Sequence, residues 1–309
     1  MPLELDELLK DLTARTQTKF SKKPTVIHKD ESFDVEKLPI DIPEWHAIDD
    51  VVSVYFDLKS STNLAKGRRP ESTASIYDAG VGGVAKILRE FEAQFVDIQG
   101  DGGFGLFWGD HRYERAVTAG ITIRTFSSDF TAQLETKWPD APSTGFKVGV
   151  ASGSLMAKRV GIPRHLTFQE PVWAGNPVNY AAKAAQQSTP DEMFVTGSVW
   201  DSIRANDFLV FSCGCGGRSS LWDTVVIEKI PDDEQYGHSL KSDWCAKHGE
   251  EYCAAILAGE TYRDDITVAE RESLNRSAEG TAETHNAVVA RAKERQRVRT
   301  VFAELSGKR

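Results

Sequence analysis

Short runs of β-branched and aromatic residues alternate along the chain with longer stretches in which apolar residues recur every three or four positions. Residues 51–57 are almost continuously apolar, which predicts a strand buried on both faces. Apolar residues then return at helical spacing, which predicts a helix over 74–93 with one apolar face. Residues 95–99 and 104–108 flank a Gly-Asp-Gly-Gly turn, so we expect a β-hairpin there.

The pattern continues with a second helix and further strands. We expect a helix over 112–137, and then a strand over 146–151 with a partner strand over 156–160. Asn176 and Pro177 are expected to open another helix, with Asn176 as N-cap and Pro177 at the first helical position. This order of elements predicts an α/β (α+β) fold with a ferredoxin-like β-α-β-β-α-β core.

The two ends of the chain differ from the middle. Residues 1–46 combine an amphipathic start with a polar connector punctuated by prolines, which predicts an N-terminal extension. Strands expected over 193–196 and 221–230 close the β-rich region. We therefore expect one domain over 47–230, followed by a largely helical C-terminal extension over 231–309.

Composition and charge narrow the class of protein. The 309 residues are 40% hydrophobic and 27% charged, which excludes wholesale disorder. The 37 Lys and Arg against 46 Asp and Glu give a net charge of −9, which argues against a nucleic-acid partner. No run approaches the ~18 apolar residues of a membrane span, and the N-terminus does not resemble a signal peptide. We expect a cytoplasmic protein without direct membrane contact.

Two carboxylates stand at expected strand ends. Asp57 ends the first buried strand and precedes a hydroxyl-rich loop, whereas Asp101 lies at the tip of the hairpin. Each could simply terminate a strand or form a turn. If the hairpin pairs with the first strand, however, the two side chains converge. Two carboxylates at adjacent strand ends are the minimal ligand set for a pair of Mg²⁺ or Mn²⁺ ions that carry a triphosphate.

A third candidate lies on the helix that Asn176 and Pro177 open. Asn179 and Lys183 are four residues apart, so they share one helix face. They are either a solvated amide and amine beside a core-facing helix, or a hydrogen-bonding group and a cation aimed at one ligand.

Three motifs occur in a specific order: Asp-Leu-Lys-Ser-Ser-Thr over 57–62, Gly-Asp over 100–101 and Gly-Asn-Pro-Val-Asn-Tyr-Ala-Ala-Lys over 175–183. They resemble the three signatures of the class III nucleotidyl cyclase catalytic domain, and the resemblance covers about 47–230. It implies a lyase that converts a nucleoside triphosphate to its 3′,5′-cyclic monophosphate and pyrophosphate. It also implies two divalent metal ions, Mn²⁺ or Mg²⁺, per site, and a homodimer with sites at the interface.

The resemblance assigns roles to the first two motifs. Asp57 and Asp101 match the two metal-binding aspartates of the family. Leu58 matches the residue whose backbone carbonyl also reaches a metal. The positions that match the triphosphate-binding loop are Ser60, Ser61 and Thr62.

The third motif implies the part of the site that the second chain of the dimer contributes. Asn179 matches the amide that orients the ribose. Lys183 stands where the family has the arginine that stabilises the transition state. A lysine gives a point charge with less fixed geometry than a planar guanidinium.

The positions that read the base depart from the family pattern. Asp97 stands where adenylyl cyclases carry Lys and guanylyl cyclases carry Glu. Val172, where adenylyl enzymes carry Asp or Thr, cannot hydrogen-bond an adenine edge. Tyr55 and Trp173 place bulky rings near the expected base pocket, or else pack in the core.

These departures resemble the bacterial cyclases of Pycsar anti-phage systems, which make cyclic pyrimidine nucleotides that activate a separate effector protein. The resemblance implies UTP as substrate, with CTP second, and a cyclic product (cUMP or cCMP) that acts as a second messenger in antiviral defence. The alternatives are a guanylate or adenylate cyclase and, from another class, a catalytically inactive nucleotide-binding regulatory module.

All four cysteines lie in the C-terminal third, where they are thiols or metal ligands if the compartment is reducing. Together with a nearby histidine they offer zinc ligands, but their spacing matches no standard zinc pattern. We therefore favour buried free thiols over a structural Zn²⁺ site. The residues concerned are Cys213, Cys215, Cys245, His248 and Cys253.

Overall fold

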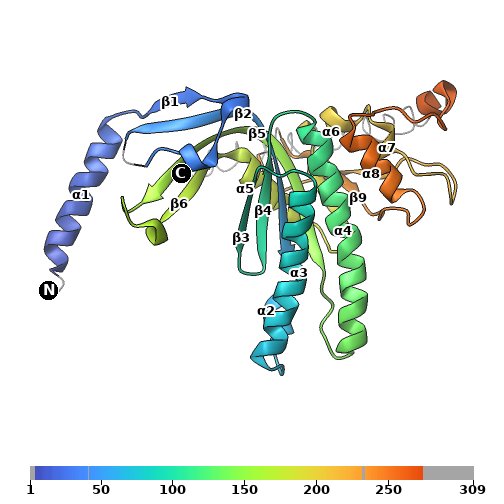
Figure 1. Ribbon diagram of the computed structural model, residues 1–309, viewed down its shortest axis with the longest axis horizontal. Helices are drawn as coiled ribbons and strands as arrows, with labels where there is room; N and C mark the ends of the chain where they lie inside the picture. The colour runs from blue at the N-terminus through green and yellow to red at the C-terminus, as the bar shows by residue number, and fades with distance from the viewer. Residues whose placement is uncertain (1–3, 41, 232–233, 274–309) are drawn as a thin grey trace, which may run out of the picture. The chain divides into compact units, whose positions relative to one another are not determined.

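The computed structural model describes residues 4–40, 42–231 and 234–273, and their contacts divide them into two compact units (Figure 1). The smaller unit contains the described residues of 4–49 together with 155–174. The larger unit contains residues 50–154 and the described residues from 175 onward. The predicted division into 1–46, 47–230 and 231–309 stays a prediction, and most of the expected C-terminal helical extension lies outside the described residues.

A mixed sheet forms the centre of the larger unit. Its strands run in the order β3-β4-β2-β5-β7-β9-β8. Of β2, β3, β4 and β5, taken in chain order, the sheet therefore has the second, third, first and fourth side by side. This is the order of a ferredoxin-like core and confirms the predicted fold class. The strands are β2 (Glu44–Leu58), β3 (Phe95–Gln99), β4 (Gly102–Phe107), β5 (Phe146–Gly161), β7 (Met193–Thr196), β8 (Trp222–Val226) and β9 (Tyr236–Leu240).

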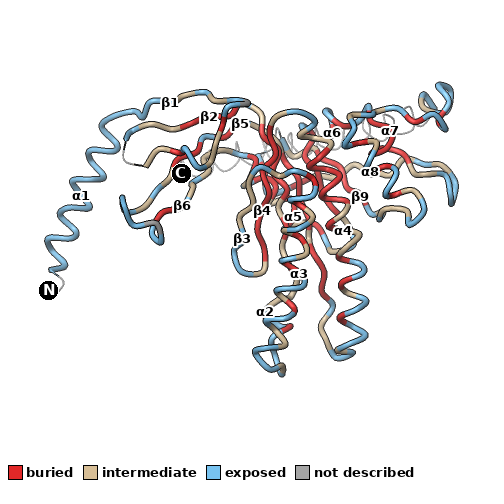
Figure 2. The backbone as a smooth tube through the Cα atoms, in the orientation of Figure 1, coloured by how far each residue is buried: buried red, intermediate tan, exposed pale blue. Residues whose placement is uncertain are grey.

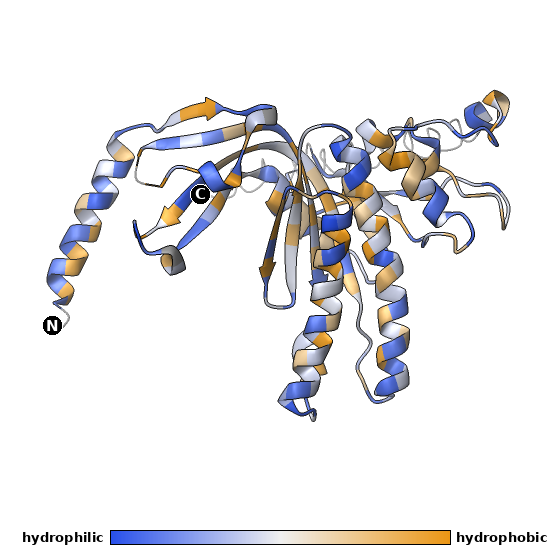
Figure 3. Cartoon of the chain, viewed as in Figure 1, coloured by the Kyte–Doolittle hydropathy of each residue, from blue (hydrophilic) through white to orange (hydrophobic). Residues whose placement is uncertain are grey.

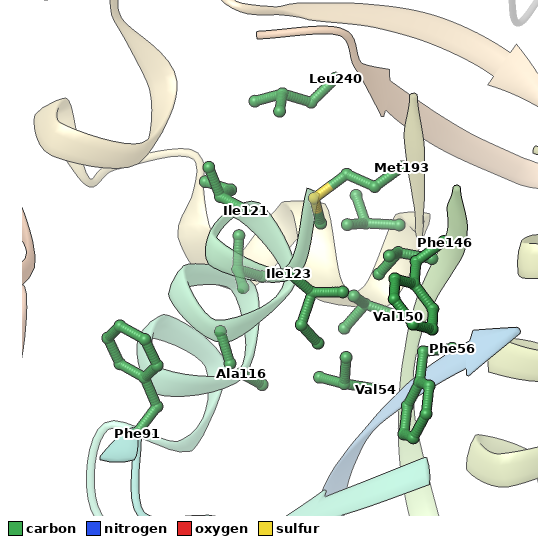
Figure 4. Packing of buried hydrophobic residues seen from close by; sticks show 14 of the residues in the cluster. Val54, Phe56, Phe91, Ala116, Ile121, Ile123, Phe146, Val150, Met193 and Leu240 are labelled. Atoms are coloured by element: carbon green, nitrogen blue, oxygen red, sulfur yellow. The ribbon is translucent and has the colours of Figure 1, made fainter. Parts of the chain in front are cut away.

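Two long helices pack together against one face of this sheet (Figures 1 and 2). They are α3 (Pro70–Glu90) and α4 (Arg112–Lys137). Side chains at every second position of β2 and β5 bury against them, because successive strand residues point to opposite faces. Figure 4 shows part of this core, whose labelled members include Val54, Phe56, Ala116, Ile123, Phe146 and Val150.

The opposite face of the sheet carries α5 (Asn176–Gln187). A smaller apolar cluster joins this helix to β5 and β7 through Tyr180, Ala181 and Phe194, and Tyr55 of β2 packs against its edge. Tyr55 lies between Val54 and Phe56 on β2. Because successive strand residues point to opposite faces, its ring points to the α5 side. The short helices of the larger unit are α2 (Ser61–Leu64), α6 (Gly197–Ile203), α7 (Asp207–Val210) and α8 (Gly249–Leu257).

The smaller unit has few helices and little core. Its strand β1 (Thr25–His28) pairs in parallel with the first part of β2, and β6 (Gln169–Gly175) pairs with β5. Helix α1 (Leu5–Ser21) buries none of its residues, and Figure 3 shows apolar positions between hydrophilic ones along it. The 3₁₀ turns of this unit are Asp30–Ser32, Val35–Lys37 and Leu166–Phe168.

Two of the expected elements are corrected by the structure. Residues 156–160 are not a partner strand; they continue β5, which stays extended through Gly153 at φ 152°. The polar residues after Ala151 suggest a turn, but the backbone does not reverse there. Asn176 is the first helical residue of α5 and not its N-cap, a position that Gly175 takes.

No helix among the described residues combines the length and the apolar composition that crossing a bilayer requires.

Gly149 on β5 sets how closely α5 approaches the sheet. A Cβ at this position would lie 2.2 Å from the carbonyl oxygen of Ala181 and 2.4 Å from the backbone nitrogen of Ala185. We expect Gly149→Ala to cost about 1–3 kcal/mol of unfolding free energy, because a rigid helix backbone has to shift. The melting temperature should fall by several degrees, as differential scanning calorimetry can measure.

Gly82 on the exposed side of α3 is the matched control for that substitution. Its nearest neighbour would lie 3.9 Å from an added Cβ. Gly82→Ala is expected to leave stability unchanged or raise it by up to about 1 kcal/mol, because alanine favours a helix. Equal losses in both variants would contradict the packing argument.

Candidate active site

The two carboxylates predicted to converge lie at the same end of neighbouring strands. Asp57 on β2 stands opposite Gly102 on β4 in the antiparallel register, directly after Asp101. The backbone N–H of Leu58 donates to the carbonyl oxygen of Asp101 at 3.1 Å, which holds the hairpin tip against the end of β2. A side chain at position 102 would meet the carbonyl oxygen of Phe56 at 2.8 Å, so glycine keeps the space beside Asp57 open.

Charge in this corner of the sheet is negative and only partly compensated. Burial, and then the charge of Asp101, raise the pKa of the Asp57 carboxyl, whereas Lys147 opposes them. Burial and the charges of Asp57 and Asp101 also raise the pKa of the Tyr55 phenol. Two hard oxygen donors that repel each other fit divalent cations such as Mg²⁺ or Mn²⁺, with substrate oxygens and water completing the coordination.

The hydroxyl-rich loop after Asp57 is fixed at its base. The N–H of Lys59 donates to the carbonyl of Gly145 at 3.0 Å, and the Thr144 hydroxyl donates to the carbonyl of Lys59 at 2.6 Å. Ser60 adopts a left-handed conformation (φ 61°) and starts the single turn of α2. The first N–H groups of a helical turn have no intrahelical acceptor, so this loop has donors for an anion.

Three side chains form a row across three strands. Tyr55 on β2, Phe104 on β4 and Asp97 on β3 are direct antiparallel partners, and such partners share a face. Because Asp57 follows Tyr55 by two residues on β2, it lies on this face as well. The structure therefore brings Tyr55 and Asp97 to the face that carries one of the two carboxylates.

Gln99 is a further candidate that the sequence analysis missed. Its side-chain amide donates to Asp97 Oδ2 at 3.0 Å. The signal was available, since residues two apart on a strand share a face, but an isolated Gln before a turn carries no recognisable pattern. The Gln99 carbonyl oxygen and the second carboxylate oxygen of Asp97 offer two more hydrogen-bond acceptors.

Val172 and Trp173 belong to the smaller unit, on β6. The Trp173 ring packs on Phe33 with centroids 5.9 Å apart, whereas Val172 is exposed. Of the two readings weighed for the Trp173 ring, this contact supports packing. The assignment of both residues to base recognition stays a prediction.

Asn179 and Lys183 lie on α5 in the larger unit. The Asn179 amide donates to the Gly175 carbonyl at 3.3 Å, and the Lys183 ammonium lies 5.6 Å from the centroid of the Tyr180 ring. Among the described residues, no hydrogen bond or ion pair joins either side chain to Asp57 or Asp101.

The four cysteines are free of disulfides, but the expectation that they are buried is wrong. Cys215 is exposed and the other three cysteines are half-buried. The structure also brings Cys213, Cys215, Cys245 and His248 together as a candidate metal centre and leaves Cys253 outside it.

Comparison with known proteins gives close relatives. No model of a protein family matches the chain. A uridylate cyclase of Micromonospora echinofusca is 50% identical over 276 residues, which are 88% of this chain and 90% of that protein. A uridylate cyclase of Propioniciclava tarda is 44% identical over 279 residues, which are 89% of this chain and 90% of that protein.

A solved structure with the same fold supports the architecture. An adenylyl cyclase of P. aeruginosa matches 66% of this chain and 98% of its own with a TM-score of 0.53 at 15% identity. At that identity the likeness shows the fold alone. The two relatives that match most of the chain lead to one conclusion: the chain belongs to the family of the uridylate cyclases, and it is a nucleotidyl cyclase.

Proposed function

We propose that this cyclase converts UTP, and CTP less efficiently, to the 3′,5′-cyclic monophosphate with release of pyrophosphate. The names of the two most extensive relatives reported above support this choice of base. The observation that carries the proposal is the row of Tyr55, Phe104 and Asp97 on the face that also holds Asp57. A base seated on this row would have its triphosphate directed toward the carboxylates.

The residues that one chain contributes fall into two groups: those that would hold metal ions and those that would bind the triphosphate. Two divalent ions, Mn²⁺ or Mg²⁺, held by Asp57, Asp101 and the carbonyl of Leu58, would activate the ribose 3′-hydroxyl and stabilise the leaving pyrophosphate. The backbone N–H groups of the loop that contains Ser60, Ser61 and Thr62 would hold the triphosphate.

Asn179 and Lys183 complete the site from the second chain of a homodimer. The Asn179 amide would fix the ribose, and the Lys183 ammonium would offset charge on the α-phosphate as pyrophosphate leaves. The resemblance to class III cyclases, in which two catalytic domains share each site, supports this arrangement.

Hydrogen bonds to the base explain the preference for uracil. The Asp97 carboxylate would accept from the N3–H of uracil, and the Tyr55 hydroxyl would donate to a ring carbonyl. Cytosine has no N3–H, which makes CTP the second substrate. Guanine also presents an N–H to a carboxylate, so guanylate cyclase activity is the alternative that Asp97 favours.

The test is a comparison of the four ribonucleoside triphosphates in the presence of Mn²⁺, with products identified by mass spectrometry. We expect cUMP to form fastest and cCMP second. Faster formation of cGMP or cAMP than of both pyrimidine products would refute the substrate assignment. The assignment to the cyclase family would not be affected.

Tyr55→Phe removes one hydroxyl from the row and keeps the ring. An unpaired buried polar group costs about 1–3 kcal/mol, so the UTP-to-ATP ratio of kcat/KM should fall roughly ten- to hundredfold. Tyr77→Phe on α3, where the ring packs against the main core, is the control and should keep the ratio. An unchanged UTP-to-ATP ratio in Tyr55→Phe would show that the Tyr55 hydroxyl takes no part in base recognition.

As part of the same proposal, the cyclic product acts in the cytoplasm as a second messenger that activates a separate effector protein in antiviral defence. The resemblance to Pycsar cyclases supports this role. Phage should form fewer plaques on a lawn of cells that carry the cyclase with its effector than on a lawn of cells that carry the Asp57→Ala cyclase with the same effector. Equal plaque numbers would contradict a defence role.

A further inference from the structure

Four side chains that cyclisation does not use meet at one end of the larger unit. The ligand atoms of Cys213, Cys215, Cys245 and His248 all lie within 4.8 Å of one another. The first two precede β8, the last strand in the sheet order, and the other two precede α8. Since β5, β7 and β9 stand between β2 and β8, this cluster is separate from the site at Asp57.

The first pair of ligands lies in a narrow loop. Isolated β-bridges join Phe211 to Ser220 and Gly214 to Gly217, so the chain folds back on itself between them. Gly214 separates the two cysteines and has a φ of +82°, in the left-handed region that favours glycine. The sequence Cys213-Gly-Cys215 is therefore held in a fixed turn that presents both thiols.

The second pair lies in a turn that leads directly into α8. The backbone N–H groups of His248 and Gly249 donate to the Cys245 carbonyl at 3.1 and 2.7 Å. The His248 ring stacks on Tyr252 of α8, with centroids 5.8 Å apart and planes 22° apart. These contacts set the direction of the imidazole independently of any ligand.

Two distances inside the cluster match those of a tetrahedral zinc site. His248 Nδ1 lies 3.4 Å from Cys215 Sγ and 3.8 Å from Cys245 Sγ. With Zn–S bonds near 2.3 Å and Zn–N bonds near 2.0–2.1 Å, tetrahedral geometry separates a sulfur from a nitrogen by about 3.6 Å. One ring nitrogen thus lies near two sulfurs, which is the arrangement that a shared cation would hold.

Charged groups lie beside the turn that holds the first two cysteines. The Arg218 guanidinium is next to it, since its Nη2 would be 3.5 Å from a Cβ on Gly214. The same guanidinium pairs with Asp265 at 2.7 Å and with Glu270 at 3.1 Å. A Zn²⁺ ion with three thiolates carries a net charge of −1, which this cation can offset only in part.

We propose that Cys213, Cys215, Cys245 and His248 bind one structural Zn²⁺ ion. A complete set of four thiolate and imidazole ligands is typical of structural zinc and leaves no open position for catalysis. The ion would tie the loop over 211–220 to α8, whose Tyr252 and Ile256 pack in the main core. The conformation of the segment that follows β9 would then depend on metal.

Metal content of the full-length protein tests the proposal. After incubation with Zn²⁺ and removal of unbound metal on a desalting column, mass spectrometry of the metal should find about one zinc per chain. Co²⁺ loaded in its place should give the visible absorption bands of a tetrahedral thiolate site. Less than about a tenth of a zinc per chain after loading would overturn the proposal. So would a disulfide that forms between two of these cysteines in protein that was reduced before loading.

Single substitutions test the ligand set. Cys215→Ser and Cys245→Ser are each expected to lower bound zinc well below one per chain, and to lower the melting temperature by several degrees. Cys253→Ser is the matched control, because Cys253 lies on α8 but outside the cluster, and burial raises the pKa of its thiol to about 11. If Cys253→Ser lost as much zinc as the other two, the ligand assignment would be wrong.

Removal of metal from the unchanged chain avoids variants that fail to fold. A chelator should lower the melting temperature of the wild-type protein, and added Zn²⁺ should restore it, because metal binding to such a site is coupled to folding. The Cys215→Ser protein should show neither effect. A chelator response of equal size in wild-type and Cys215→Ser protein would place the responsible metal elsewhere.

Discussion

Replacing Asp57 or Asp101 by alanine is expected to abolish formation of the cyclic nucleotide. Each carboxylate would hold metal charge worth several kcal/mol in the transition state, and each 1.36 kcal/mol is a factor of ten in rate. A loss of about a thousandfold or more in kcat should therefore appear in a discontinuous assay of product. Near-normal turnover of either variant at saturating Mn²⁺ would contradict the two-metal assignment.

Folding and chemistry can be separated in this experiment. Burial and the neighbouring Asp101 disfavour the charged form of Asp57, so removing that charge is not expected to destabilise the folded chain. Calorimetry and size-exclusion chromatography should give wild-type values for both variants. Asp129→Ala, at an exposed position on α4, is the matched control and should keep full activity.

Mixing two inactive variants is expected to restore activity if each site is shared between two chains. In a heterodimer of Asp57→Ala and Lys183→Ala, one site carries both lesions and the other carries neither. After complete exchange of equal amounts, half of the dimers are heterodimers. The mixture should therefore reach about a quarter of wild-type activity, measured after exchange has been demonstrated with differently tagged chains.

The control mixture combines Asp57→Ala with Asp101→Ala. Both residues come from the same side of the proposed site, so every site of that heterodimer keeps one lesion and the mixture should stay inactive. Equal recovery in both mixtures, or no recovery in the first, would count against a site built across the interface.

Much of the core could be predicted from local periodicity. The helix expected over 112–137 and the strands expected over 95–99 and 193–196 match α4, β3 and β7. β7 lies wholly inside the core and α4 is largely buried in its first half, so their apolar patterns are clear. β3 is an edge strand without a fully buried residue, and the turn after it is what made it recognisable. The two strands expected over 146–151 and 156–160 are a single strand, because pairing with β6 keeps polar residues extended.

Local patterns were less informative for the candidate sites. The convergence of Asp57 with Asp101 followed from one assumption, that the hairpin pairs with the first strand, and the register of β2 with β4 confirms it. The hydrogen bond between Gln99 and Asp97 was missed. The contact of Trp173 with Phe33, which lies 140 residues earlier in the sequence, was not predicted either. The contact between Trp173 and Phe33 joins residues that no local spacing relates, whereas Gln99 and Asp97 lie within one strand.

The amino-acid sequence was enough for most of the order of elements, the ferredoxin-like class and the three motifs that resemble those of a cyclase, because each motif lies within one strand, helix or turn. Only the tertiary structure decided which side chains share a face across three strands, and that Cys213 and Cys215 meet Cys245 and His248. The physical reason is the same in both cases. Strand register and the packing of α8 are set by contacts between distant parts of the chain, whereas the cysteine spacing records only the length of chain between the ligands.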